Sequence, residues 1–456
     1  MDLVFELVKN IIDTDFKKLP KETIHITEKC ILDTLGVLLA GTKQPGCKTV
    51  VDFLKEMSGK EESKIINYGG KVPSFNAALA NATMARALDL DDVHEASGCH
   101  PSATMVPVAF AVAEKTGVIN GKDLITSIVV GTDLTCRLRL AVKTYPGWVS
   151  ETFSVFGATA TAGKILELNE EEMVNAMGIA YSQAACNFQG FEDGALTPRL
   201  QQGFASKAGI ISALLAQRGI TGAKNVLQGR FGFYSLYYRN NYDPTIVTKN
   251  LSKKFEIDNV SIKPYTSCKH THGPIWGVLE LVNNYNISAQ DIVEIKVGVS
   301  RYAYNLVCQP AEAKYKPRTV VDAQFSIPYT VACAIIKRDV FVDEISSEAI
   351  TNPKVLKMAK KVKPFVDPEI DKIHSFVAPK SLAKIKTRDG KVYAKYTEDI
   401  KGSPRKPMSF EEVAKKFEKC TKYAIYPPSK EKIIKITKTV WELEKIVDVG
   451  KIVEAL

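Results

Sequence analysis

The spacing of apolar residues changes along this chain, and the change restricts the folds that it can adopt. Through about residue 250, apolar residues recur at helical spacing, and several segments are apolar on most sides, as in helices buried inside a bundle. From 292 to 299 apolar and polar residues alternate, with Val293 and Ile295 on one face, which predicts a half-buried strand. Segment 382–396 predicts two strands joined at Asp389-Gly390, a favoured hairpin turn.

Helical spacing returns near the end of the chain. Segments 409–419 and 429–445 predict two further helices. The sequence therefore predicts a mainly α fold class, with a large all-helical domain formed by both chain ends and a smaller inserted α+β domain. The expected parts are 1–262 (helical), 263–404 (α+β) and 405–456 (helical return).

Two helix starts carry capping signals. Ser74 precedes an Ala-rich segment that predicts a helix over 75–89, and we expect the Ser74 side chain to cap that helix. Asn169 followed by Glu172 has the spacing of a capping box before another helix.

Length and composition are those of a globular protein. At 456 residues two domains are expected, and contents of 45% hydrophobic and 25% charged residues are typical of soluble chains. The longest apolar run, 106–113, is far shorter than the roughly 18 residues that a spanning helix needs. The amino-terminal segment carries acidic residues and lacks the basic start of a signal peptide. No membrane partner is therefore expected.

Charge and cysteine content give further expectations. The formal charge is +10, but the lysines concentrate in the last third, without interleaved aromatic residues or a nucleic-acid motif. We therefore expect solvated surfaces and no nucleic-acid partner, while a positive field would suit an acidic small molecule. The nine cysteines include no CxxC pair, which predicts free thiols and a cytoplasmic location.

One short polar loop concentrates groups that transfer protons. It holds three aspartates and two of the six histidines of the chain: Asp89, Asp91, Asp92, His94 and His100. Carboxylates this close cannot all stay ionised cheaply when buried, so at least one is expected to have a raised pKa and to act near neutral pH. Asp89 and His100 are predicted to be functional. For Asp91 and Asp92, capping a turn or pairing with an arginine is an equal alternative.

A second polar segment offers cationic and nucleophilic groups. Lys263 and Tyr265 can bind a carboxylate, or stabilise the enolate-like oxygen that forms when a proton leaves the neighbouring carbon. Cys268, His270 and His272 could instead bind a metal ion, because alternate residues of an extended segment share a face. No standard zinc spacing is present, so a metal is not expected.

The motifs of common cofactor sites are missing from the sequence. It contains no GxGxxG after a strand, no P-loop, no GxSxG and no HExxH. No cofactor is therefore expected, and the chemistry is assigned to side chains.

A series of short motifs runs in order along nearly the whole chain. The series is Ala77 to Asp92, His100-Pro-Ser, Gly121-Lys-Asp-Leu with Arg137, Phe156-Gly-Ala, Asn175 to Gln183, Ala205 to Leu215, Lys263-Pro-Tyr, Asp322 to Tyr329 and Lys406-Pro-Met-Ser. In this order the motifs resemble the MmgE/PrpD family, which includes 2-methylcitrate dehydratase, cis-aconitate decarboxylase and iminodisuccinate epimerase. The resemblance implies a helical domain built from both chain ends, a smaller lid domain and a homodimer. It also implies a small di- or tricarboxylate substrate and no redox or iron–sulfur cofactor.

Site residues are expected on both sides of the junction between core and lid. By position, the resemblance implies catalytic roles for Asp89, His100, Lys263 and Tyr329. We expect one further catalytic pair, Cys268 and His270. The residues expected to bind substrate are Asp92, His94, Arg199 and Lys269.

The chain departs from the family pattern at several positions. Val93 stands where a threonine is common, and Gly147-Trp-Val-Ser-Glu-Thr stands where the family has His-Pro-Thr. Arg199 lies near the place of an expected lysine, and Cys268 takes the place of a histidine of cis-aconitate decarboxylase. These differences are expected to decide which reaction the chain catalyses.

The leading hypothesis is a cofactor-independent lyase, most simply a dehydratase of a 2-hydroxy polycarboxylic acid. His100 or a neighbouring aspartate would be the base, Lys263 and Arg199 would hold carboxylates, and Tyr329 would protonate the leaving group. The alternatives are an epimerase or isomerase with a base in each polar segment, a cis-aconitate-type decarboxylase, and a catalytically silent binding homologue. A metal-dependent hydrolase is a minor alternative.

Overall fold

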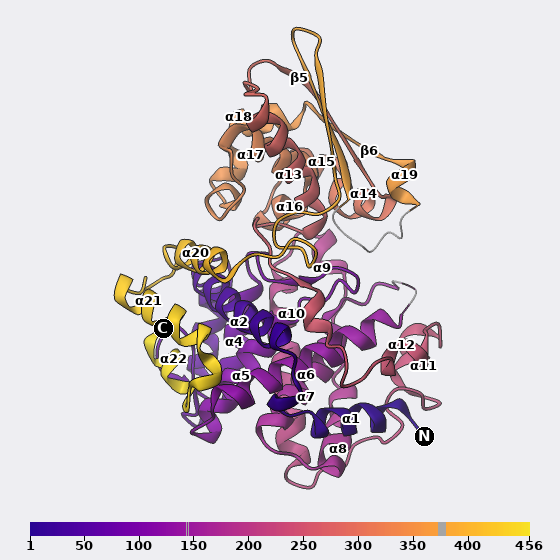
Figure 1. The fold of residues 1–456 in the computed structure, drawn as a ribbon, viewed down its shortest axis with the longest axis vertical. Coiled ribbons are helices and arrows are strands. Elements are labelled where there is room, and N and C mark those ends of the chain that lie inside the picture. The colour runs from indigo at the N-terminus through magenta and orange to yellow at the C-terminus, as the bar shows by residue number, and fades with distance from the viewer. Residues whose placement is uncertain (143, 145, 373–379) are drawn as a thin grey trace.

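The computed structural model describes residues 1–142, 144, 146–372 and 380–456. It shows a larger helical body, which contains both termini, and a smaller body that stands on it and contains a four-stranded sheet (Figure 1). The smaller body runs from α13 (Lys269–Asn284) to β8 (Val392–Thr397) and is called the lid below. One cluster of buried apolar side chains fills the larger body, and a second lies mainly in the smaller body but includes Val149 and Phe191 of the larger one. The predicted domain boundaries at 262 and 404 stay predictions.

Long helices form the centre of the larger body. Helix α10 packs against both α4 and α7, and α6 packs along α7. The predicted capping box at the start of α8 is confirmed, because the Asn169 side chain accepts from the Glu172 N–H and the Glu172 side chain accepts from the Asn169 N–H. The helices of this part are α1 (Leu3–Asp13), α2 (Lys21–Gly41), α3 (Cys47–Glu56), α4 (Ser74–Arg86), α5 (Ser102–Thr116), α6 (Gly121–Leu140), α7 (Glu151–Ile165), α8 (Glu170–Tyr181), α9 (Gln189–Glu192), α10 (Thr197–Ala216), α11 (Phe233–Tyr238) and α12 (Pro244–Thr248), with 3₁₀ turns η1 (Phe16–Lys18) and η2 (Glu256–Asn259).

Two facing glycines let α6 and α7 approach closely. A Cβ on Gly131 would lie 2.7 Å from the carbonyl oxygen of Gly157, and a Cβ on Gly157 would lie 2.4 Å from that of Gly131. No side chain fits at either position without moving backbone. This contact fixes α7, whose first residue reaches the site described below.

The C-terminal segment returns to the larger body and packs on its N-terminal helices. Helix α20 lies against α2 and starts with a capping box between Ser409 and Glu412. Its buried Lys416 pairs with Asp33 of α2 at 2.7 Å and donates to the carbonyl oxygen of Leu90 at 3.0 Å. The elements of the return are α20 (Phe410–Thr421), α21 (Lys430–Trp441), η5 (Leu443–Lys445) and α22 (Gly450–Ala455).

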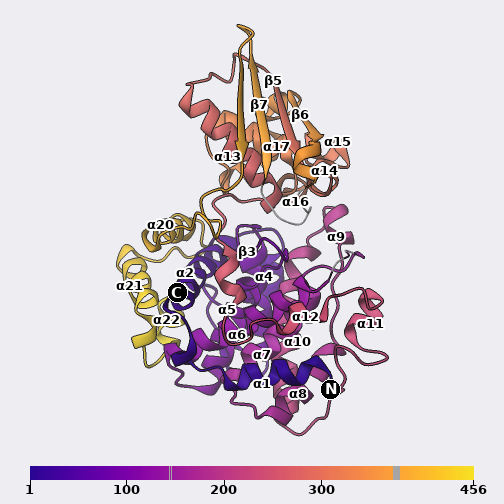
Figure 2. The same cartoon turned by 45° about the vertical axis from the view of Figure 1, so that its right-hand side comes forward.

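The lid consists of one mixed sheet with helices packed against it (Figure 2). The strand order is β6-β5-β7-β8, in which β5 is parallel to β6 and antiparallel to β7, and β7 and β8 form an antiparallel hairpin. Helix α13 packs on β7 and β8, and α17 packs on α13 and β6. The other elements are β5 (Ile292–Val299), α14 (Arg301–Cys308), α15 (Ala311–Tyr315), α16 (Val320–Gln324), α17 (Ile327–Lys337), η3 (Asp343–Ile345), η4 (Ala349–Thr351), α18 (Pro353–Ala359), β6 (Val362–Val366), α19 (Pro368–Asp371) and β7 (Ser381–Thr387).

The expected fold class is wrong as stated, because the larger body is not all-helical. Strand β1 (Ser63–Lys64) pairs with β2 (Lys71–Val72), and β3 (Val93–His94) pairs with β4 (Val260–Ser261), both antiparallel. Each strand has two residues, too few for an alternating pattern to be recognised, and β3 and β4 are far apart in the sequence. The pairing of β3 with β4 brings the polar loop around Asp89–His100 next to the chain that leads into the polar segment from Lys263.

Two local predictions also fail. Val293 was expected on the buried face of its strand, but its side chain is exposed and Ile292 is buried, because the pairing of β5 with β7 shifts register between Ile292 and Glu294. Ser74 does not cap a helix; it is the first residue of α4, after Pro73, and its N–H donates to Glu62.

Two further predictions concern the whole chain. Among the described residues, no helix combines the length and the apolar character that crossing a membrane requires. The nine cysteines are free thiols, and eight of them are buried.

Removing the Lys416 ammonium should destabilise the protein strongly. In Lys416→Ala the buried Asp33 carboxyl loses its partner, and breaking a buried pair from one side costs about 3–5 kcal/mol of unfolding free energy. Chemical denaturation checks this, with Lys415→Ala as the control because the neighbouring Lys415 is exposed. Equal midpoints for the two variants would show that the pair does not hold the C-terminal return in place.

Candidate active site

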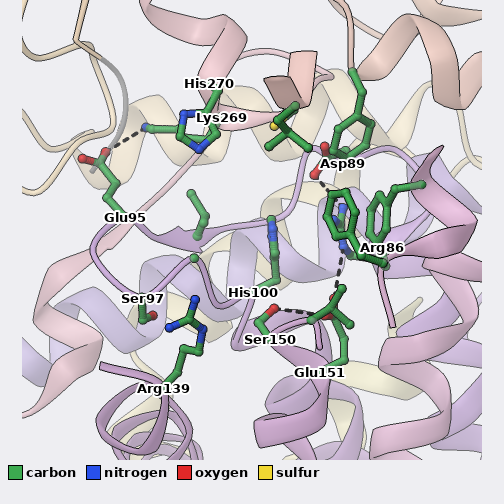
Figure 3. Close-up of a pocket in the computed structure, with 18 of the residues that line it drawn as sticks. Arg86, Asp89, Glu95, Ser97, His100, Arg139, Ser150, Glu151, Lys269 and His270 are labelled. Carbon is green, nitrogen blue, oxygen red and sulfur yellow. Dashed lines mark hydrogen bonds and ion pairs between the residues drawn. The ribbon is translucent and has the colours of Figure 1, made fainter. Parts of the chain in front are cut away.

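A cavity lies where the lid meets the larger body, and both contribute to its walls (Figure 3). The larger body supplies Arg86, Asp89, Val93, Glu95, Ser97, Gly98, His100, Arg139, Val149, Ser150, Glu151, Phe188 and Phe191. Cys268, just before α13, and the lid residues Lys269, His270, Tyr302, Leu306 and Phe325 complete the lining. Five of the ten residues with predicted site roles therefore line this cavity: Asp89, His100, Cys268, Lys269 and His270.

The Asp89 carboxylate is shared by two buried cations. Its Oδ1 lies 2.6 Å from Arg86 Nη1 and 2.6 Å from Lys263 Nζ. Lys263 also donates to the Asp89 carbonyl oxygen at 2.8 Å, which holds this residue in its left-handed conformation (φ 50°) just after α4. Burial would raise the pKa of Asp89, but the charges of Arg86 and Lys263 outweigh it and lower the pKa. Asp89 is therefore a fixed anion, and a poor proton acceptor near neutral pH.

The His100 ring is oriented by two acceptors on the same nitrogen. Its Nδ1 lies 2.9 Å from the carbonyl oxygen of Asp92 and 3.1 Å from Asp91 Oδ2. Because the Asp92 carbonyl oxygen can only accept, Nδ1 carries the proton of the neutral ring, and Nε2 is the nitrogen that can take up another. The ring extends into the cavity (Figure 3). This is the arrangement of an oriented general base.

The lid places one cation and one imidazole at the start of α13. Lys269 Nζ lies 3.0 Å from Glu95 Oε1, so this pair joins lid and body across the cavity. Burial lowers the pKa of Lys269 against the opposing charge of Glu95. Burial also lowers the pKa of His270, to about 4, so His270 is neutral near pH 7 and its ring packs edge-on to Tyr302.

Cys268 does not suit the acid–base role expected of it. Burial raises the pKa of its thiol to about 12, so it stays protonated at neutral pH. It lines the cavity as a small, neutral side chain. A pair made of this thiol and a neutral His270 is a weak base.

Three helices begin at the cavity. His100 lies just before α5, Ser150 and Glu151 begin α7, and Cys268 precedes Lys269 at the start of α13. Helix N-termini carry partial positive charge and attract anions. The Nε–H of the buried Arg86 also has no hydrogen-bond partner among the described residues, which is costly unless an acceptor binds there. The site therefore suits an anionic ligand.

Four of the predicted residues lie outside the cavity walls because their side chains bond elsewhere. Tyr329 donates to the Glu344 carbonyl oxygen at 2.7 Å, and Arg199 donates to that of Pro45 at 2.7 Å. The Asp92 carboxyl binds the Ser102 N–H and hydroxyl, and His94 Nε2 lies 3.0 Å from Glu256 Oε2. Lys263, the fifth, reaches the site through Asp89.

The metal alternative does not hold at the residues suggested for it. In the described part of the chain, Cys268, His270 and His272 do not group closely enough to share an ion; the group that does is Asp89, Asp91 and His100. There the charges of Asp89 and Asp91 are already balanced by Arg86 and Lys263, so little negative charge is left for a cation.

Comparison with known proteins identifies the relatives of this chain. Residues 6–245 match the MmgE/PrpD N-terminal domain, and residues 265–443 match the MmgE/PrpD C-terminal domain. The chain belongs to the MmgE/PrpD family. This confirms the resemblance seen in the ordered motifs.

Three relatives show how far the similarity extends. Cis-aconitate decarboxylase of Aspergillus terreus (strain NIH 2624 / FGSC A1156) is 26% identical and covers 96% of this chain and 92% of its own. Human cis-aconitate decarboxylase is 26% identical over 93% of this chain and 89% of its own. Cis-aconitate decarboxylase-like protein oryM of Aspergillus oryzae is 24% identical over 95% of this chain and 93% of its own.

Sequence reasoning missed several residues of the cavity. Arg86 is the arginine that the sequence offered as a partner for Asp91 or Asp92, with no role of its own, and Glu151 belongs to the stretch that departs from the family pattern. Glu95 and Arg139 gave no separate signal, since single charged residues are common on helices and loops. Phe156-Gly-Ala lies within α7, so the short distance from Ser150-Glu151 to this motif was a clue that these two residues begin the same helix.

The prediction of a raised carboxyl pKa in the first polar loop is confirmed at Asp92. Burial raises the pKa of Asp92 from 3.8 to about 7, although the Ser102 hydroxyl opposes the shift. The folded protein therefore keeps this proton between about pH 4 and 7 while the unfolded chain loses it. The contribution of Asp92 to stability is full below pH 4 and falls as the pH rises toward 7.

Asp92→Asn should remove this pH dependence. Asparagine resembles the protonated carboxyl and can still bond to Ser102, so the variant should gain stability relative to the parent by about 1.4 kcal/mol per pH unit between pH 4 and 7. Denaturation of both proteins at a series of pH values measures the difference. A constant difference across that range would mean that Asp92 is ionised in the folded protein.

Proposed function

We propose that this enzyme of the MmgE/PrpD family is a cofactor-independent lyase that acts on a small di- or tricarboxylic acid by removing a proton next to a carboxylate. The observation that carries the proposal is the orientation of His100, whose Nδ1 faces two acceptors while its ring enters the cavity. A base held in this way acts without rearrangement.

The surrounding charges support binding of a carboxylate substrate. Arg86 and Lys269 face the cavity beside the N-termini of α7 and α13, and Lys263 keeps Asp89 in place behind them. When a proton leaves the carbon next to a carboxylate, negative charge moves onto the carboxylate oxygens. Cations and helix N-termini already aimed at that position stabilise the charge as it develops.

In the dehydration that we favour, His100 Nε2 takes the proton from the carbon next to the carboxylate. The electron pair of the broken C–H bond forms the double bond, and the hydroxyl on the adjacent carbon leaves as water with the proton that His100 took up. This route does not use Tyr329, whose hydroxyl is bonded to Glu344 away from the cavity.

Decarboxylation is a second candidate, because relatives over nearly the full chain are named cis-aconitate decarboxylases. In that reaction a C–C bond breaks, carbon dioxide leaves, and a protonated His100 would deliver the proton to carbon. A homodimer, a cytoplasmic location and the absence of a nucleic-acid partner stay predictions.

Solvent exchange tests the proposal and separates these reactions. Proton NMR in heavy water over citrate-, malate- and aspartate-like acids should show deuterium entering next to a carboxylate. An unsaturated acid with loss of water indicates dehydration, labelled carbon dioxide released from a carbon-13-labelled acid indicates decarboxylation, and exchange without either product indicates epimerisation. Tight binding with no exchange and no product would contradict the proposal and favour a silent binding homologue.

His100→Asn should lower kcat by about 100-fold or more and leave KM nearly unchanged, because the ring transfers a proton and contributes little to binding. The control is His25→Asn, since His25 lies half-exposed on α2 beside Glu28. Activity of His100→Asn within a few-fold of the parent would mean that another group is the base.

A further inference from the structure

Glu151 places a carboxylate in the cavity wall. A carboxylate at this position would repel an anionic ligand, so its presence needs an explanation. It is the first residue of α7, its side chain is 2% exposed, and it lines the cavity beside Arg86 and Ser150 (Figure 3). Glu151 lies in the stretch Gly147-Trp-Val-Ser-Glu-Thr, which stands where the family has His-Pro-Thr. The proposed reaction gives Glu151 no role.

A network of neutral side chains holds this carboxylate. Gln202 of α10 donates from Nε2 to Glu151 Oε1 at 2.9 Å, and Ser150 donates from Oγ to Oε2 at 3.0 Å. Gln202 is itself fixed by the hydroxyl of Thr104 on α5. Because α5, α7 and α10 all belong to the packed bundle, the carboxylate cannot turn away from a ligand without breaking these bonds.

Arg86 is the cation beside the Glu151 carboxylate, but it forms no hydrogen bond with it. The start of α7 attracts negative charge, and Arg86 Nε lies 3.9 Å from Oε1, beyond hydrogen-bond distance. Arg86 bonds instead to Asp89 at 2.6 Å. Oxygen atoms of Glu151 can therefore still accept hydrogen bonds from a ligand in the cavity.

The charges on the cavity wall balance. Among the described residues that line it, the cations are Arg86, Arg139 and Lys269, and the carboxylates are Asp89, Glu95 and Glu151. A ligand with three carboxylates would bring three negative charges to a wall with no net charge. One of its carboxylates would have to lie near a fixed anion, which costs binding energy when both are removed from water.

We propose that Glu151 selects the substrate: its fixed carboxylate accepts a hydrogen bond from a hydroxyl or ammonium group of a dicarboxylate and excludes a third carboxylate. This inference rests on the proposed function and narrows its substrate class. A site built around a fixed acceptor discriminates strongly, because a ligand without the matching donor leaves the acceptor unpaired and buried. The same acceptor repels a carboxylate placed there.

Binding of three small acids tests the selection with a readout other than turnover. Calorimetry with malate, succinate and tricarballylate compares a donor-bearing dicarboxylate, a plain dicarboxylate and a tricarboxylate. We expect malate to bind most tightly and tricarballylate at least about tenfold more weakly. In Glu151→Gln the neutral amide should lower the ratio of malate affinity to tricarballylate affinity about tenfold or more, mainly because tricarballylate binds more tightly.

Controls separate this inference from the proposed function. Glu192 is exposed on α9, so Glu192→Gln should leave the relative affinities for the three acids unchanged. If Glu151→Gln does not fold, Glu151→Asp, which withdraws the carboxylate by one methylene, should shift the ratio in the same direction. Tricarballylate bound as tightly as malate by the parent, or an unchanged ratio in a folded Glu151 variant, would overturn the inference alone. No binding of any acid would overturn the proposed function as well.

Discussion

The site depends on one buried group of charges, the Asp89 carboxylate held between Arg86 and Lys263. These three residues come from the end of α4, the loop after it and the segment before α13, so the group ties the chain that leads into the lid to the larger body. Removing charges from water is expensive, and the cost is offset only when every charge has a close partner. Two cations on one carboxylate leave a net positive charge there, which the nearby Asp91 balances through Arg86 at 3.3 Å. Asp91 in turn lies 3.1 Å from His100 Nδ1, so the group of charges also helps to orient the His100 ring.

The β3–β4 ladder explains how two segments far apart in the sequence reach this group. Val93 pairs with Ser261, which places residue 89 and residue 263 on neighbouring stretches of chain. The Ser261 hydroxyl also donates to Glu95, the partner of Lys269. A short ladder therefore sets the register between the two walls of the cavity.

Much of the helical framework was predictable from the sequence, because long amphipathic or apolar segments and capping boxes such as Asn169–Glu172 are local signals. The cavity residues Asp89, His100, Lys269 and His270 were found because they cluster in short polar segments. What failed depended on distant contacts. Tyr329 belongs to a family motif, but the turn of α17 directs its hydroxyl to Glu344. Glu151 is an isolated acid in the sequence, and only the packing of α7 against α10 brings it to the cavity.

The glycine contact between α6 and α7 has a consequence for how such a site can change over evolutionary time. Gly131 and Gly157 lock the middle of α7 to its neighbour, six residues beyond Glu151, while the first turn of α7 faces the cavity. Mutations in that first turn alter the ligand's surroundings without touching the locked contact. If Glu151 selects the substrate as proposed, the contact that fixes α7 and the residue that meets the ligand lie in different turns of one helix.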